Sequence, residues 1–223
     1  MRKIFFLAIL AISTLCGSAG AQDAKMAKDA VMKDSPKGFV SIEDATRSAL
    51  NVGAKMPSFT LNDSLGKAVS SADLLKEGNL VIVFYRGAWC PFCNTYLHNL
   101  QKNLTQIKEN GGTLVAISVE NADRSLAIAK KNEINFTVLS DPNLDVARTF
   151  GIVYQLPDAT VEKYKGFGLD LAKYNGTEKA ELPLSATYVV NKKGEIVYAF
   201  LEPDYKKRAE PEVIIQTLAG LKK

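Results

Sequence analysis

Continuous apolar runs alternate with amphipathic segments through the middle of the chain. Three of these runs are rich in β-branched residues and cover residues 79–85, 113–120 and 136–141. Runs of this length and composition are typical of strands that are buried on both faces of a sheet. Apolar residues recur at helical spacing in the segments that follow, residues 93–112, 122–132 and 142–151. The alternation predicts three consecutive strand–helix units.

Hairpin patterns flank these units on both sides. Residues 58–75 contain a Ser-Leu-Gly turn and predict a hairpin followed by a short helix. Residues 186–201 predict two strands around a Lys-Lys-Gly turn, and residues 210–223 predict a last helix. Strand–helix units joined to hairpins require strands of both directions in one sheet. The predicted fold class is therefore α/β, a sandwich with a mixed central sheet flanked by helices.

The segment 22–51 precedes this pattern and does not share it. It is rich in Ala, Lys and Asp, and it predicts an N-terminal helical arm or linker. An apolar face that includes Val40, Ile42 and Ala45 could pack on the domain or on a second subunit, which leaves a homodimer open. We interpret the segment as a tether without chemistry.

Residues 155–183 interrupt the pattern between the third unit and the closing hairpin. They contain two segments that predict short helices, and aromatic residues such as Tyr164 and Tyr174. A connection of this length in a compact domain is often functional. The insertion would either cover the reactive end of the sheet or add packing on the surface.

The first residues of the chain are typical of a secretory signal peptide over residues 1–21. A basic start precedes an apolar run from Ile4 to about Leu15, and Ala19-Gly20-Ala21 provides a small-residue cleavage site. The apolar run is too short to span a bilayer comfortably, so no stable membrane insertion is expected after cleavage. We predict an exported protein, periplasmic or secreted.

The charge balance argues against nucleic acid as a partner. Removal of residues 1–21 takes away two of the 28 basic residues and none of the 24 acidic ones, which leaves a net charge of +2. A charge this small provides no basic surface for a phosphate backbone. The basic runs are interpreted as solvated faces: Lys130-Lys131, Lys192-Lys193 and Lys206-Lys207-Arg208.

Two cysteines, Cys90 and Cys93, remain after removal of the leader, which contains Cys16. A structural zinc site needs four ligands, and these two thiols with the single histidine, His98, are too few, so no metal site is predicted. A haem-attachment motif needs histidine directly after the second cysteine, where this chain has Asn94. A structural disulfide between residues this close would constrain the unfolded chain little. These exclusions favour a reactive pair that needs no metal or organic cofactor.

The position of the two cysteines also favours redox chemistry. The buried strand ends at Tyr85, a short turn follows, and Pro91 suits the first position of the next helix. Cys90 then occupies the N-cap and Cys93 the third helical position, where free N–H groups and the helix dipole favour a thiolate. Residues three apart on a helix are close enough to form a disulfide. We predict a reversible disulfide between Cys90 and Cys93.

Two neighbouring residues are candidates to support these thiols. Arg86 carries a permanent cation four residues before Cys90, where it would stabilise a thiolate or bind a polar substrate oxygen. The alternative for Arg86 is a surface salt bridge. Trp89 directly precedes Cys90 and would shield the site. His98 lies on another face of the helix, and we interpret it as a surface or packing residue rather than a catalytic base.

The segment "VFYRGAWCPFCNTYL" resembles the signature of the peroxiredoxin-like branch of the alkyl hydroperoxide reductase and thiol-specific antioxidant (AhpC/TSA) family, which has a thioredoxin fold. The segments "VGAKMPSFTLNDSLGK", "VLSDPNLDVARTFGI" and "ATYVVNKKGEIVYAF" are similar to the family's opening hairpin, Asp-Pro loop and closing hairpin. The likeness runs from about Val52 to Leu221. It implies a thioredoxin-like peroxiredoxin domain over residues 52–223, with the insertion at about 155–183.

The cysteine motif departs from that of ordinary peroxiredoxins. Their Pro-x-x-x-Thr-x-x-Cys falls on the segment from Arg86 to Cys93, which implies that Cys93 is the peroxidatic cysteine and that Cys90 replaces threonine. The arginine of ordinary peroxiredoxins falls at Ser185. In the similar thioredoxin pattern Trp-Cys-x-x-Cys, the first cysteine attacks, and the nearest candidate for the thioredoxin cis-proline is Pro183. The identity of the attacking cysteine therefore stays open.

The resemblance implies a thiol-dependent peroxidase. One thiolate would attack hydrogen peroxide or an organic hydroperoxide and become a sulfenic acid, and the other would condense with it to the Cys90–Cys93 disulfide. A thioredoxin-like reductant protein would then reduce this disulfide. The alternative is an exported thiol–disulfide oxidoreductase acting on protein disulfides, and a third hypothesis is a redox-inert binding module. An apolar cover over the cysteines would favour the peroxidase, and an open groove beside Cys90 the oxidoreductase.

Overall fold

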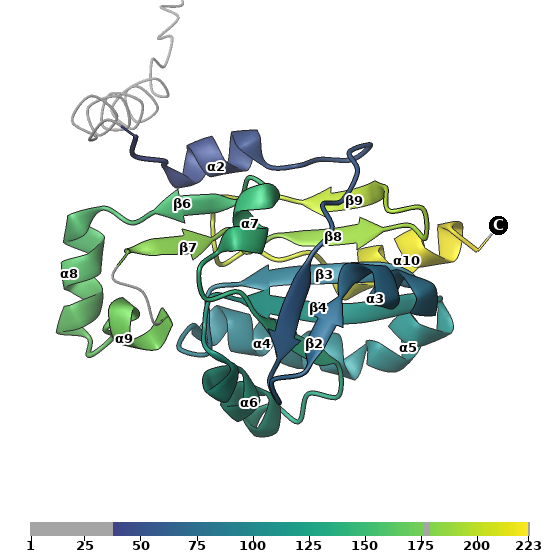
Figure 1. Cartoon of the computed structure of the whole chain (residues 1–223), viewed down its shortest axis with the longest axis horizontal. Coiled ribbons are helices and arrows are strands. Elements are labelled where there is room, and N and C mark those ends of the chain that lie inside the picture. The colour runs from purple at the N-terminus through teal and green to yellow at the C-terminus, as the bar shows by residue number, and fades with distance from the viewer. Residues whose placement is uncertain (1–37, 176–178, 223) are drawn as a thin grey trace, which may run out of the picture. The chain divides into compact units, whose positions relative to one another are not determined.

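A seven-stranded mixed sheet forms the framework of the described structure (Figure 1). The computed structural model describes residues 38–175 and 179–222, and the described helices and strands lie in the unit Val40–Lys223. The strand order is β2 (Ala68–Ser70), β1 (Thr60–Asp63), β5 (Thr137–Ser140), β4 (Gly112–Ser118), β3 (Asn79–Tyr85), β8 (Thr187–Val190) and β9 (Ile196–Phe200).

The three predicted strand–helix units supply the parallel centre of this sheet. β3 pairs in parallel with β4, and β4 with β5. Antiparallel strands complete both sides, β1 and β2 next to β5, and β8 and β9 next to β3. The predicted α/β class with a mixed central sheet is confirmed.

Helices cover both faces of the sheet because successive side chains of a buried strand point to opposite faces. Leu80, Ile82 and Phe84 of β3 join one core, and Val81 and Val83 join the other. The first core is covered by α2 (Ile42–Ser48), α3 (Ser71–Glu77) and α7 (Asp145–Thr149). The second core is covered by α4 (Pro91–Lys102), α5 (Leu104–Glu109) and α10 (Pro211–Gly220), and α6 (Ala122–Lys131) packs beside the start of α4.

The parallel strands bring their carboxyl ends to one edge of the sheet. β3 ends at Tyr85, a loop follows, and α4 begins at Pro91. Tyr85 pairs with Ser118, the last residue of β4, and Glu120 follows two residues later. The loop before α4 therefore lies beside the residues that follow β4, at the edge where open α/β sheets bind ligands.

The insertion between the third unit and the hairpin begins and ends in a second, small sheet. β6 (Val153–Gln155) pairs antiparallel with β7 (Glu181–Pro183). Between them lie α8 (Asp158–Gly166) and α9 (Leu171–Asn175), where two short helices were predicted. Figure 1 shows α8 and α9 together beside the ends of β6 and β7.

The described part of the predicted N-terminal arm is a packed helix. Ser41 caps α2, since its hydroxyl oxygen accepts a hydrogen bond from the Asp44 N–H at 3.1 Å. Ala45 is fully buried in the first core, and the Leu50 N–H donates to the carbonyl oxygen of Phe150 at 2.9 Å. The interpretation as a tether is therefore wrong for this stretch, because its apolar face packs on the domain.

The predicted signal peptide, residues 1–21, and residues 22–37 of the predicted arm lie outside the described residues. Within the described ranges, no helix is long and apolar enough to cross a membrane.

Candidate redox site

Both cysteines lie at the start of α4, where the sequence placed them. Cys90 is the N-cap residue with φ −89° and ψ 111°, and Pro91 takes the first helical position. Both residues are free thiols, with 1 % of Cys90 and 0 % of Cys93 exposed. The first turn of α4 contains no acidic residue and no side chain caps it. Its free N–H groups therefore favour a negative charge at this end.

The two thiols hold their protons unequally. A hydrogen bond from Cys93 and attraction by Arg86 and Arg208 lower the pKa of Cys90 to about 6, although burial opposes them. Burial is the main cause that raises the pKa of Cys93, and the hydrogen bond to Cys90 adds to it. Near neutral pH Cys90 is therefore the thiolate and Cys93 the protonated donor. This arrangement favours Cys90 as the nucleophile.

Arg86 is buried beside this pair, with 2 % of the residue exposed. Its Nη2 donates a hydrogen bond of 2.7 Å to the hydroxyl of Tyr164. Its Cζ lies 4.2 Å from the ring centroid of Tyr205 and 4.9 Å from that of Trp89. Aromatic faces attract a cation at such distances, so the rings hold the guanidinium in place. The alternative of a surface salt bridge is wrong for Arg86.

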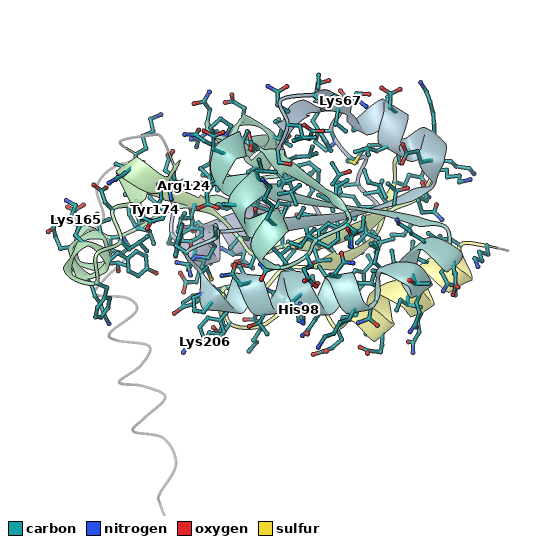
Figure 2. The ribbon with its side chains drawn as sticks, turned by 90° about the horizontal axis from the view of Figure 1, so that it is seen from below. Lys67, His98, Arg124, Lys165, Tyr174 and Lys206 are labelled. Carbon is teal, nitrogen blue, oxygen red and sulfur yellow. The ribbon has the colours of Figure 1, made fainter. Side chains whose placement is uncertain are left out.

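The insertion covers this end of the sheet through Tyr164 of α8. The ring centroids of Tyr164 and Trp89 are 5.9 Å apart, and the hydroxyl of Tyr164 binds Arg86. A second contact joins the insertion to α6, where the Cζ of Arg124 lies 4.1 Å from the ring centroid of Tyr174 (Figure 2). The described part of the insertion thus covers the cysteine loop, as one of the two interpretations expected.

Glu120 is a buried carboxyl in the site that was not among the residues predicted from sequence. Its Oε2 accepts a hydrogen bond of 2.6 Å from the Ala88 N–H, and its Oε1 has no hydrogen-bond partner among the described residues. Burial raises the pKa of Glu120 to about 7, against the opposing effects of Ala88 and Arg124. A sequence signal could have identified Glu120: it is an acidic residue that follows a buried strand, and this strand neighbours the one that leads to the cysteines.

Gly87 allows the loop before Cys90 to pass between two bulky side chains. Its φ of 141° is a conformation that other residues rarely adopt. A Cβ at this position would lie 2.4 Å from Nε1 of Trp89 and 3.0 Å from the Cδ of Glu120. Glycine is therefore required if Trp89 and Glu120 are both to contact the loop.

Arg208 is the second site residue that the sequence did not reveal. Its Nη2 lies 3.2 Å from Sγ of Cys93, to which it donates a hydrogen bond. The interpretation of the run Lys206-Lys207-Arg208 as a solvated face is therefore wrong for Arg208, although Lys206 and Lys207 are exposed. No local pattern distinguishes the third basic residue, because its contact spans 115 positions of the chain.

The structure also places three other positions that the sequence singled out. His98 is exposed on α4, as expected of a surface residue (Figure 2). Ser185 is buried, and its hydroxyl has no hydrogen-bond partner among the described residues. Pro183 pairs with Val153 in the small sheet, and all described peptide bonds are trans, so Pro183 is not a thioredoxin-type cis-proline. Among the residues described, no group of three or more His, Cys, Asp or Glu side chains could hold a metal ion.

The chain matches the AhpC/TSA family over residues 52–199. It belongs to the AhpC/TSA family. A family member from Haemophilus influenzae, described as a peroxiredoxin of the bcp type, is 28 % identical over 172 residues, which cover 77 % of this chain and 98 % of that protein. Peroxiredoxin Bcp of Escherichia coli is 33 % identical over 104 residues, which cover 46 % of this chain and 65 % of that protein.

Solved structures of the family confirm the fold. The peroxidoxin BcpB of Mycobacterium tuberculosis superposes with a TM-score of 0.61 at 19 % identity, over 77 % of this chain and 98 % of that one. The thioredoxin-like sandwich implied by the sequence resemblance is therefore confirmed. The named AhpC/TSA relatives also confirm the predicted class of enzyme, a peroxiredoxin-type oxidoreductase.

Proposed function

We propose that this protein is a thiol peroxidase that reduces hydrogen peroxide or a small organic hydroperoxide, with Cys90 as the attacking and Cys93 as the resolving cysteine. The observation that carries the proposal is the asymmetric pair at the start of α4. The Cys90 thiolate sits at a helix N-terminus and receives a hydrogen bond from the Cys93 thiol. Membership of the AhpC/TSA family supports the class of reaction.

The first step is attack of the Cys90 thiolate on one oxygen of the peroxide. The O–O bond breaks, the sulfur is oxidised by two electrons to a sulfenic acid, and the other oxygen leaves as water or an alcohol after taking a proton. In the second step the Cys93 thiolate attacks the Cys90 sulfur. The S–O bond breaks, hydroxide leaves and takes the proton that Cys93 gave up, and the products are a disulfide and one water.

Arg86 has the properties that the first step requires. It is a permanent cation close to Cys90, and its Nε is a buried donor without a hydrogen-bond partner among the described residues. That N–H is free to donate to a peroxide oxygen as negative charge develops on it. Its other contacts, to Tyr164 and to the ring of Tyr205, hold the guanidinium in one orientation.

The cover over the cysteines supports a small substrate. Both sulfur-bearing residues are buried, and Tyr164 of the insertion lies over the loop that leads to Cys90. A hydroperoxide with a short chain needs little space beside the thiolate, whereas a folded protein would have to displace the insertion. This favours the peroxidase over the thiol–disulfide oxidoreductase.

A dithiol protein of the thioredoxin type is the proposed reductant. Its thiolate would attack one sulfur of the Cys90–Cys93 disulfide, the other sulfur would leave as a thiolate, and the partner's second thiol would resolve the mixed disulfide. Phe92 lies between the two cysteines in sequence and is 41 % exposed, which offers an apolar contact next to the disulfide. Because both cysteines are buried, this half of the cycle needs a local opening of the loop.

Rapid mixing with peroxide tests the proposal directly. Trp89 is the single tryptophan of the chain and lies in the site, so its fluorescence reports the oxidation state of the two thiols. The reduced protein, Cys90→Ser and Cys93→Ser would each be mixed with increasing hydrogen peroxide. We expect a fast phase proportional to peroxide in the unchanged protein and in Cys93→Ser, and its loss in Cys90→Ser.

Two other results would change the proposal. If Cys93→Ser loses the fast phase and Cys90→Ser keeps it, Cys93 is the attacking cysteine. If the unchanged protein reacts no faster than a free thiol, it is not a peroxidase. Reduction of a disulfide in a test protein would then support the oxidoreductase.

We also propose that the protein acts after export. The support is the pattern of residues 1–21, a basic start, an apolar run and a small-residue cleavage site. N-terminal sequencing of the protein from the periplasmic fraction of an expressing bacterium should give a chain that begins at Gln22. An unprocessed chain in the cytoplasm would contradict this proposal without bearing on the peroxidase.

A further inference from the structure

Arg208 lies against the dithiol but comes from a loop far from the cysteine motif. We propose that Arg208 is a catalytic residue of the resolving step, in which it stabilises the Cys93 thiolate while Cys93 closes the disulfide with Cys90. The inference rests on the proposed function, in which Cys90 attacks the peroxide first. It gives the closure its own cation, Arg208, which also attracts the Cys90 thiolate but donates directly to the sulfur of Cys93, whereas Arg86 serves the attack.

The contact between Arg208 and Cys93 is direct. The Nη2 atom of Arg208 lies 3.2 Å from Sγ of Cys93, within hydrogen-bond distance of a sulfur acceptor. A guanidinium N–H can only donate, so this contact becomes stronger when the sulfur carries a negative charge. The geometry is therefore better suited to the Cys93 thiolate than to the thiol.

Arg208 is held in this orientation before the reaction. Its Nη1 donates hydrogen bonds to the carbonyl oxygens of Tyr205 and Lys207, the latter at 2.7 Å. Its Cζ lies 5.8 Å from the ring centroid of Tyr96, whose hydroxyl lies 3.2 Å from that of Thr187. A donor that is fixed in advance need not reorganise when charge forms on the sulfur. The main-chain hydrogen bonds hold Nη1 of the guanidinium, and they thereby orient Nη2 toward Cys93.

The resolving step needs such help because Cys93 is the less acidic thiol. It is fully buried, and burial disfavours its charged form. Once Cys90 is a sulfenic acid, its negative charge is gone, which removes one cause that held the proton on Cys93. Arg208 then supplies the opposite charge that stabilises the Cys93 thiolate, so that Cys93 loses its proton more readily.

Arg208 also connects Cys93 to the solvent. It is half-buried and borders a groove of about 780 Å³, together with Phe92, Tyr96 and Lys206. Water in this groove can accept the proton that Cys93 loses and return it to the hydroxide that leaves Cys90. The step therefore balances as one disulfide and one water from one sulfenic acid and one thiol.

The first test measures the two steps separately in Arg208→Met, Arg208→Lys and the control Lys67→Met. Lys67 is an exposed cation outside the groove that Arg208 borders, labelled in Figure 2, so its removal changes the net charge equally. After rapid mixing with peroxide, the phase that depends on peroxide reports the attack, and the phase that does not reports the closure. We expect Arg208→Met to slow the closure about tenfold or more at pH 7, which corresponds to a rise of about one unit in the pKa of Cys93.

The rate of closure in Arg208→Met should recover as the pH is raised, because more Cys93 is then deprotonated. A mere loss of structure would not produce this recovery. Arg208→Lys should restore part of the rate, since it keeps the charge but not the planar fork. Lys67→Met should leave both phases as in the unchanged protein.

The second test measures the Cys93 thiolate without any turnover. In a Cys90→Ser background, the ultraviolet absorbance of the thiolate would be titrated with Arg208 present and with Arg208→Met. Cys16, if retained, contributes equally to both curves. We expect the titration of Cys93 to move to higher pH when Arg208 is removed.

The outcomes separate this inference from the proposed function. An unchanged closure rate and an unchanged Cys93 titration in a folded Arg208→Met variant would overturn the role of Arg208, while the attack by Cys90 would stand. Loss of the peroxide-dependent phase in Arg208→Met, together with its loss in Cys93→Ser, would instead show that Cys93 attacks first. That result would overturn the proposed function as well.

Discussion

The two arginines at the dithiol are held in contrasting ways. Arg86 is fully buried among aromatic rings, four residues before Cys90 in the chain. Arg208 is half-buried, fixed by main-chain carbonyl oxygens, and donates directly to the sulfur of Cys93. The ring contacts of Arg86 keep an N–H free for a substrate, whereas the contact of Arg208 is already made. In the proposed mechanism, one cation therefore meets the substrate and the other stabilises a protein group.

The surroundings of the two arginines also differ, because one side of the dithiol is closed and the other borders solvent. The Arg86 side is closed by Tyr164 of the insertion and contains the buried carboxyl of Glu120, which binds the same loop. The Arg208 side borders a groove that reaches solvent. Electrostatic effects are stronger where water is excluded. Changes on the Arg86 side should therefore have larger effects than changes on the Arg208 side.

The largest effect is expected from Glu120→Gln on the closed side. The pKa of Glu120 is raised to about 7 in the folded protein, so folding favours its protonated form. Protonated Glu120 therefore contributes to the free energy of unfolding below about pH 4.5, and this contribution is lost as the pH rises through about 7. Relative to Glu120→Gln, the unchanged protein should lose roughly 3 kcal/mol of its free energy of unfolding over this range. Urea unfolding of both proteins from pH 4.5 to pH 8 measures the difference. Parallel stability curves would show that Glu120 ionises freely in the fold.

Arg86→Met should have the next largest effect, on the attack step. Loss of the buried cation removes both a stabilising charge for the Cys90 thiolate and a donor for the peroxide. We expect the peroxide-dependent phase to slow about a hundredfold, which equals roughly 2.7 kcal/mol of activation free energy. Its pH profile, which should rise through the Cys90 pKa of about 6 in the unchanged protein, should move to higher pH. Arg86→Lys serves as the control that keeps the charge, and the closure phase should change much less.

Tyr164→Phe should have a smaller effect in the same direction. It removes the hydrogen bond of 2.7 Å that orients the Arg86 guanidinium but keeps the ring against Trp89. Loss of a hydrogen bond to a charged group is worth about 1.5 kcal/mol, so the attack should slow about tenfold or less. Tyr174→Phe, in the same insertion but with its ring on Arg124 of α6, is the matched control. An equal effect of the two variants would show that the insertion acts only through its stability.

The smallest expected quantity is the coupling between the two arginines. If only Arg208 acts on the closure, the double variant Arg86→Met with Arg208→Met should slow the closure as Arg208→Met alone does. The deviation from additivity should stay within about 0.5 kcal/mol for the closure phase, whereas a larger deviation is expected for the attack phase, because both arginines attract the Cys90 thiolate. A coupling well above this value in the closure phase would mean that both cations stabilise the Cys93 thiolate, and the contrast between them would fail.

Several features of the site were predictable because they depend on neighbours in the chain. The continuous apolar run 79–85 predicted the buried strand that leads into the site, and Pro91 indicated the start of the helix. Together they placed Cys90 at the N-cap and Cys93 in the first turn. The insertion and its two short helices were likewise visible as a break in the alternation of strands and helices.

Other features could not be predicted because their partners are distant in the chain. Arg208 appeared as the last member of a basic run, and no periodicity separates it from the exposed Lys206. Glu120 appeared as one acidic residue after a strand, and its burial follows only from the pairing of β3 with β4. Packing of α2 on the domain was one of the possibilities, but the tether was preferred, because a short apolar face is compatible with a tether until a partner surface is known.

The sequence by itself therefore determined the local chemistry: two thiols at a strand–helix junction, a nearby arginine, and the AhpC/TSA family. Helix ends, caps and alternation depend on interactions over a few residues, so they can be recognised in the chain itself. The tertiary structure decided which thiol is the more acidic and which charges surround each. Those properties depend on burial and on contacts that span 78 positions for Arg86 with Tyr164 and 115 for Arg208 with Cys93. Only the folding of the sheet brings such residues together, because electrostatic interactions depend on distance in space and not on distance along the chain.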